Sequence, residues 1–280
     1  MKEFLVLFFM FFLSNVLFAS PKYLEKKYFY TDEYGSVKIS SDLLEFEDGK
    51  ESGVLIEKKY FTMFLGDKYN YIILDCIVDE IDFLTIVKKD IHSKFEYSGW
   101  EMTYNEILNN SEYKAAKLVP FSVIKAVSFI TEKGKNGKEI RFLPEEYNFF
   151  SLGSNPWAVK KDDEKVIYLS TERWWHPTIV YYPVSDIVFV NGFVYPDKDY
   201  LYEQNSRAKR VRISYNETSF EAELQDTGNF QVVHLPAAID PKAKNNIKLE
   251  ILDYYPGTKY SDIVISGVYY MDAVLEKKKN

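Results

Sequence analysis

Aromatic and hydrogen-bonding residues gather between two strand-like segments in the second half of the chain, at residues 191–207. The candidate contact residues there are Tyr195, Tyr200, Tyr202, Asn205 and Arg207. Tyrosine faces pack on the apolar patches of sugar rings, and amide and guanidinium groups hydrogen-bond hydroxyls in fixed directions. The segment therefore predicts a carbohydrate-contacting loop. The alternative is that Asn205 and Arg207 tie the loop to the fold while the tyrosines cover its edge.

The adjacent tryptophans Trp174 and Trp175 are a second candidate. Neighbouring residues in a strand point to opposite faces, so one of the two indoles is expected to reach solvent or a loop end. An exposed indole would indicate ligand contact, and a buried one would indicate packing. His176 follows them, but the other two histidines, His92 and His234, have no ligand spacing around it, so no metal site is expected.

Motifs of known enzymes are missing from the sequence. It contains no Gly-x-Ser-x-Gly elbow, no His-Glu-x-x-His helix and no dinucleotide glycine fingerprint. Acidic pairs such as Glu145–Glu146 and Asp162–Asp163 are typical of solvated turns. We therefore predict no catalytic activity, and a hydrolase whose two carboxylates meet only in the fold stays as the third hypothesis.

The charge balance argues against a polyanionic partner. The formal net charge is −7, which repels nucleic acid on average. One basic run stands out, formed by Arg207, Lys209, Arg210 and Arg212. A strand would divide these side chains between two faces, which favours a solvated edge. The single cysteine, Cys76, excludes an internal disulfide and is expected in the core.

The first 19 residues are predicted to be a cleavable signal peptide. Lys2 precedes an unbroken apolar run over residues 4–13, and Ala19 is a small residue suited to cleavage. Ser14 and Asn15 stop the run short of the ~20 residues that a membrane-spanning helix needs. We expect an exported protein, in the periplasm, on the outer surface or secreted, without a stable membrane span after cleavage.

The fold is predicted to be all-β. Aromatic residues make up 17% of the chain, which favours strands, and short strands broken by hairpin-sized turns fill residues 28–87. These indicate a small antiparallel meander or barrel, either a scaffold or a ligand cup. Residues 211–215 and 247–251 alternate apolar with polar, as in a sandwich wall. The expected division is a β-rich domain at 21–100, a linker at 101–119, a β-sandwich at 120–272 and a charged tail at 273–280.

A series of short motifs in fixed order runs through residues 120–270. The motifs occupy residues 128–133, 134–138, 144–148, 155–159, 187–193, 202–209, 223–227 and 252–266. In order and spacing this half resembles the bacterial NADase-type glycan-binding domain, a relative of the discoidin and galactose-binding jelly rolls. The resemblance implies a discoidin-like jelly-roll sandwich, a glycan or polysaccharide as partner, and an accessory role beside a separate NAD-cleaving domain.

The resemblance also bears on calcium. Discoidin-type modules carry an Asp-Gly turn followed by Thr and Trp, which in some relatives forms a calcium site. Here residues 151–157 keep Trp157 but contain no carboxylate. A hard cation needs oxygen ligands with negative charge among them, so calcium is disfavoured and no cofactor is expected.

The leading hypothesis is an exported, non-catalytic carbohydrate-binding protein of the bacterial envelope or extracellular space. It predicts a loop end lined by an aromatic side chain and at least two polar groups. The alternative is an envelope structural or protein-interaction component without sugar binding. That alternative predicts a broad exposed apolar patch or an unpaired sheet edge instead.

Overall fold

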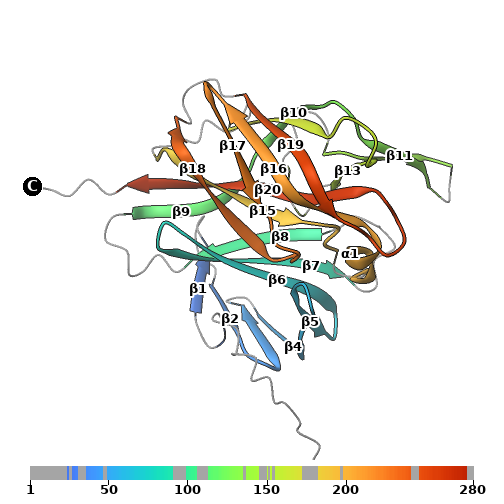
Figure 1. The fold of residues 1–280 in the computed structure, drawn as a ribbon. Coiled ribbons are helices and arrows are strands. Elements are labelled where there is room, and N and C mark those ends of the chain that lie inside the picture. Colours follow the sequence, from blue (N-terminus) through green and yellow to red (C-terminus); the bar gives the residue numbers. More distant parts are fainter. Residues whose placement is uncertain are drawn as a thin grey trace, which may run out of the picture.

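The computed structural model describes residues 24, 27–30, 36–46, 49–90, 99–105, 113–134, 137–144, 150, 152, 155–171, 182–195, 198–240 and 246–275. Apart from one short helix and turns, these residues are strands, in a barrel followed by a sandwich (Figure 1). The expected all-β class is confirmed. In the described part of the chain, no helix has the length and apolarity to cross a membrane.

The first eight strands form a closed antiparallel barrel. They are β1 (Lys27–Tyr30), β2 (Ser36–Ile39), β3 (Leu43–Phe46), β4 (Gly49–Glu57), β5 (Thr62–Gly66), β6 (Tyr69–Val78), β7 (Ile81–Asp90) and β8 (Gly99–Asn105). Each strand pairs with the next, and β1 closes the ring on β8 through the pairs Phe29–Asn105 and Tyr30–Tyr104. Closure removes the two exposed edges that an open sheet of these strands would present.

Side chains fill the barrel interior. Its core contains Val37, Ile39, Leu44, Phe64, Tyr71, Ile73, Leu84 and Ile86, all buried. The rings of Phe64 and Tyr71 meet edge to face with centroids 6.0 Å apart. Small barrels of this strand number have room for little more than their own side chains. Of the two interpretations of this half, the packed interior supports a scaffold over a ligand cup.

The second half folds into two β layers. One contains β10 (Ser122–Ala126), β14 (Val166–Ser170), β19 (Ile247–Tyr255), β16 (Ser206–Tyr215) and β17 (Thr218–Glu223). The other contains β9 (Tyr113–Pro120), β13 (Trp157–Val159), β20 (Ile263–Leu275), β15 (Val184–Asn191) and β18 (Phe230–Ile239). Side chains from both layers, among them Trp157, Phe189, Ile213 and Leu249, form one buried core. The expected β-sandwich is confirmed.

Two local expectations have different outcomes. The predicted hairpin around residues 134–138 is present, because β11 (Ile130–Lys133) pairs with β12 (Glu139–Phe142) across it. The stretch at 101–119, expected to be a linker, instead supplies most of β8 and β9. Strand β9 forms because its apolar residues gain a long partner, β20, from the far end of the chain.

The layer containing β15 and β20 is buried on both faces. Along β20, Val268 and Tyr270 point into the sandwich core, while Tyr269 and Met271 point to the barrel. The outer wall of the barrel contributes Phe61, Met63, Ile72, Leu74 and Phe83 to this second cluster. A strand covered on both faces needs apolar residues at successive positions, which explains the run at 187–190.

The barrel and the sandwich therefore share a continuous apolar interface. Cys76 lies in it and is buried, as expected for a core residue. Asn229 of the sandwich and Asp75 of the barrel form two hydrogen bonds, each 3.1 Å long. Asn229 Oδ1 accepts from the backbone N–H of Asp75, and Asn229 Nδ2 donates to Asp75 Oδ1. The two halves are thus joined by both apolar and polar contacts.

Candidate functional site

The loop between β15 and β16 carries the short helix α1 (Tyr200–Gln204), which lies beside the barrel (Figure 1). Asp199 caps its N-terminus, where Oδ1 accepts a hydrogen bond of 3.1 Å from the backbone N–H of Tyr200. At the other end, both the backbone N–H and the side-chain amide of Asn205 donate to the carbonyl of Leu201. Local capping thus determines where this helix begins and ends.

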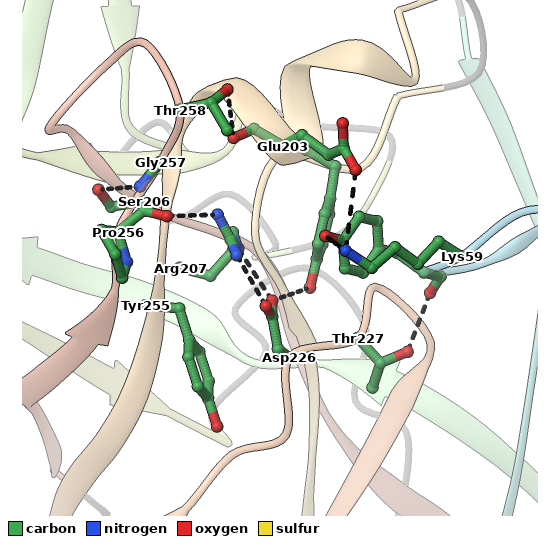
Figure 2. Close-up of polar contacts among 12 residues, drawn as sticks. Lys59, Glu203, Ser206, Arg207, Asp226, Thr227, Tyr255, Pro256, Gly257 and Thr258 are labelled. Carbon is green, nitrogen blue, oxygen red and sulfur yellow. Dashed lines mark hydrogen bonds and ion pairs between the residues drawn. The ribbon is translucent and has the colours of Figure 1, made fainter.

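Arg207 is the polar centre of the loop end (Figure 2). Its Nε and Nη2 donate to the two carboxylate oxygens of Asp226, at 3.0 and 2.8 Å. Its Nη1 donates to the carbonyls of Asn205 and Pro256. Burial works to lower the pKa of Arg207, but the hydrogen bonds and charge of Asp226 outweigh it and raise the pKa. The guanidinium therefore joins three segments as a permanent cation.

Tyr202 is completely buried, with 0% of its surface exposed. Its hydroxyl lies 3.4 Å from Asp226 Oδ1, toward which it donates. Burial, and after it the charge of Asp226, raises the pKa of Tyr202 well above its ordinary value. The backbone of Gly192, at φ +78°, allows the ring to approach closely, since a Cβ there would lie 2.5 Å from Tyr202 Cε2.

Two other tyrosines are exposed on the same loop end. Tyr200 on α1 has 52% of its surface exposed, and Tyr260, in the turn between β19 and β20, has 39%. The Nζ atom of Lys259 lies 4.9 Å from the ring centre of Tyr260. The hydrogen bond to Tyr260 contributes most to a raised pKa of Lys259, and Tyr200 is close enough to raise it further. We call Tyr200, Lys259 and Tyr260 the tyrosine platform.

The turn that carries Tyr260 is attached directly to α1. The backbone N–H of Thr258 and its hydroxyl donate to the carbonyl of Glu203, and the N–H groups of Lys259 and Tyr260 donate to that of Gln204. The last carbonyls of a helix lack partners within the helix, so they are free to bind this turn. The two exposed tyrosines consequently belong to one hydrogen-bonded framework.

The predicted contact residues divide into three groups in the structure. Tyr202, Asn205 and Arg207 are buried, and their polar groups bind the loop itself, as in the alternative that the sequence left open. Tyr195 is half-buried, with Lys198 Nζ 5.8 Å from its ring centre, and Tyr200 is exposed. Trp174 and Trp175 lie outside the described residues.

Sequence reasoning did not single out Lys259 and Tyr260, which the structure places beside Tyr200 on α1. They belong to the motif at residues 252–266, which carried the family resemblance but was not considered as a ligand site. The available signal was the Pro256–Gly257 pair, which predicts a turn just ahead of Lys259 and Tyr260. What was not visible is that this turn packs on α1.

The basic run forms no concentrated patch. Lys209 pairs with Asp253 at 3.8 Å, Arg210 with Glu221 at 3.2 Å, and Arg212 with both Glu221 and Glu250. Acidic residues on the neighbouring strands β17 and β19 thus lie beside each of these cations. Arg207 is separated from them, because it is buried against Asp226.

A serine, an aspartate and a histidine with the outline of a catalytic relay meet among the described residues. No group of three His, Cys, Asp or Glu side chains there could hold a metal ion. Ser185, Asp186 and His234 lie together, but both the serine hydroxyl and the histidine ring bind the aspartate. A nucleophilic relay needs the serine on the histidine, so this arrangement does not activate Ser185.

A discoidin-like β-sandwich with an aromatic loop end is the class of structure that these observations define. Residues 179–271 match the family model described as the NAD glycohydrolase translocation F5/8 type C domain. The matched segment includes β15, α1, β16 to β19 and most of β20, and therefore most of the loop end. No curated protein and no solved structure matches the chain.

Proposed function

We propose that this chain is an exported, non-catalytic carbohydrate-binding protein, and that its tyrosine platform is the face that meets the glycan. The supporting observation is the pair of exposed tyrosines, Tyr200 and Tyr260, held on one framework with the ammonium group of Lys259 beside the ring of Tyr260. Exposed aromatic rings supply the flat apolar faces on which sugar rings pack, and the ammonium group supplies directed hydrogen bonds.

The non-catalytic part of the proposal has its own support. The description of the matched family names translocation, and not NAD cleavage, as the task of this domain. The loop end agrees with this assignment, because the guanidinium of Arg207 is fully engaged in holding the loop through Asp226 and two backbone carbonyls. A binding and delivery role fits both observations.

A glycan array probed with the mature protein tests the proposal directly. We expect selective binding that Tyr200→Ala and Tyr260→Ala each weaken by roughly tenfold, which corresponds to about 1.4 kcal/mol. Val54→Ala is the matched surface control, because Val54 is exposed on the barrel. Trp175→Ala tests the second sequence candidate in the same experiment. An array without signal at high micromolar protein would remove the proposal.

Export is tested by the mass of the protein recovered from cells. If the first 19 residues are a signal peptide, the mature chain begins at Ser20 and is found in the periplasmic or extracellular fraction. Intact mass spectrometry of each fraction gives the answer. A chain that retains Met1 and stays with the cytoplasm would contradict this part of the proposal.

A protein-interaction role is the second candidate, because one apolar pair is exposed on the barrel. Val54 and Leu65 lie directly opposite each other on β4 and β5, and both are exposed. Val54→Cys would place a thiol on this surface, while the native Cys76 is buried. Cross-linking from Val54→Cys to an envelope component, together with a blank glycan array, would favour this role.

A further inference from the structure

The turn between β4 and β5, residues 58–61, docks onto the loop end of the sandwich. We call it the barrel turn. The carbonyl of Tyr60 accepts two hydrogen bonds from the sandwich, 2.9 Å from Thr227 Oγ1 and 2.8 Å from the backbone N–H of Gly228. Two bonds on one carbonyl hold the backbone of the barrel turn at a defined position, independently of its side chains.

The aromatic side chains of the barrel turn cover the buried face of α1. The ring of Tyr60 packs on that of Tyr202 with centroids 4.3 Å apart, and Phe61 meets Tyr202 edge to face at 6.2 Å. Gly228 leaves the room for this contact, because a Cβ on it would lie only 3.0 to 3.1 Å from Phe61 and Tyr202. The barrel turn thus helps to bury Tyr202, the only buried residue of the helix.

The lysines of the barrel turn bind the outer side of α1. Lys58 Nζ lies 3.1 Å from Asp199 Oδ2, while the other oxygen of that carboxylate caps the N–H of Tyr200. Lys59 Nζ lies 4.0 Å from Glu203 Oε1, one turn further along (Figure 2). Each lysine therefore pairs with one acidic residue, Lys58 with Asp199 at the start of the helix and Lys59 with Glu203 near its end.

Helix α1 depends on such contacts for its order. It has five residues, and isolated helices shorter than about 12 residues are not stable in water. Its carbonyls in turn hold the turn that carries Tyr260. A continuous set of contacts therefore runs from the barrel turn through α1 to both aromatic residues of the platform.

We propose that the barrel turn positions the tyrosine platform, with Tyr60 as the main positioning residue. This assigns a task to the barrel, whose interior is filled and whose sequence carries no ligand signal. The inference rests on the proposed function of the platform. A loop that is ordered before binding avoids the entropic cost of ordering on binding, so a platform without its support would bind the same glycan more weakly.

Hydrogen exchange of the free protein tests the positioning without any ligand. The backbone N–H groups of Leu201, Tyr202 and Asn205 donate to carbonyls within α1 or in the two residues before it. The N–H of Tyr260 donates to the carbonyl of Gln204, at the end of α1. In Tyr60→Ala we expect these amides to exchange at least roughly tenfold faster, because the helix loses its packing partner. Tyr60→Phe keeps the ring and should match the wild type, as should the surface control Val54→Ala.

The same variants on the glycan array separate the two proposals. We expect Tyr60→Ala to lose roughly fivefold in affinity for the glycans that the wild type binds, although Tyr60 packs on Tyr202 and is not one of the platform residues. A wild type that binds no glycan refutes the proposed function, and the exchange result then decides the positioning alone. Unchanged exchange and unchanged affinity in Tyr60→Ala refute the positioning and leave the function standing.

Thr227→Val serves as a second variant in case Tyr60→Ala fails to fold. It removes the hydrogen bond to the Tyr60 carbonyl and the one that Thr227 Oγ1 accepts from the N–H of Asn229, and it keeps the size of the side chain. Faster exchange in α1, with protected amides unchanged in β14 and β19 of the sandwich core, supports the positioning. If the mutation changes exchange in α1 no more than in those core strands, the positioning is contradicted.

Discussion

Arg207 and Asp226 are joined by two parallel hydrogen bonds, Nε to Oδ1 and Nη2 to Oδ2, at the loop end of the sandwich. The same guanidinium binds the carbonyls of Asn205 and Pro256, which belong to two other segments. One side chain therefore fixes the exit of α1, the turn after β19 and the loop that meets the barrel turn. Its planar shape is what allows four bonds in three directions.

Arg207→Lys is expected to lower the free energy of unfolding by about 3 kcal/mol, although the charge is kept. An ammonium group cannot bind both carboxylate oxygens and both carbonyls in this geometry, so some of these partly buried acceptors lose their partner. Urea unfolding followed by circular dichroism measures the change. Arg210→Lys is the control, because Arg210 forms an exposed pair with Glu221 and should change stability by less than about 1 kcal/mol. Equal losses in the two variants would contradict the assignment.

Tyr202→Ala is expected to lower the stability of the fold much more than Tyr200→Ala, although both residues lie on one short helix. Tyr202 is fully buried between the sandwich and the barrel, so its removal should cost about 4 kcal/mol of stability. Tyr200 is exposed, so its removal should change stability by less than about 0.5 kcal/mol. Thermal unfolding of both variants, beside the glycan array, makes the comparison. A large loss of stability in Tyr200→Ala would show that it is a packing residue.

Gly192→Ala is expected to destabilise the fold by about 3 kcal/mol. The backbone there has φ +78°, and a Cβ would lie 2.5 Å from the buried ring of Tyr202. Both the strained backbone and the displaced ring contribute. Gly49→Ala is the control, since nothing lies within 4 Å of its Cβ position. Urea midpoints of the two variants should differ clearly, and similar midpoints would argue against the close approach of Tyr202.

Stability should fall at alkaline pH because of Cys76. Burial, and after it the negative charge of Asp75, raises the pKa of the Cys76 thiol well above its ordinary value of 9.0. The unfolded thiol ionises near that ordinary value while the folded thiol stays neutral, so the unfolded state gains stability as the pH rises above about 9. The stabilising effect is complete below pH 9 and is lost progressively above it.

Unfolding experiments on wild type and Cys76→Ala between pH 8 and pH 10.5 isolate this effect. The difference in unfolding free energy between the two proteins should be constant at the lower end and should shrink at the upper end, in favour of the variant. Other groups titrate equally in both proteins and cancel. A difference that does not change with pH would mean that the thiol of Cys76 ionises as easily in the folded protein as in the unfolded one.

The strands were the most predictable part of this protein. Alternation of apolar and polar residues at 211–215 and 247–251 predicted walls of a sandwich, and both segments are strands with one buried face. The turn at residues 134–138 was predictable for the same reason, since glycine and asparagine favour tight turns locally. These features depend on neighbouring residues alone, which is why a sequence pattern can reveal them.

What faces the solvent was decided by the tertiary structure. Tyr200 and Tyr202 are equivalent candidates in the sequence, but the barrel turn packs on one side of α1 and buries only Tyr202. Tyr260 joins Tyr200 because a turn far along the chain binds the helix carbonyls. The sequence by itself determined an all-β chain with sugar-compatible side chains in its loops. The tertiary structure decided which of them are exposed, because burial depends on segments that meet only after folding.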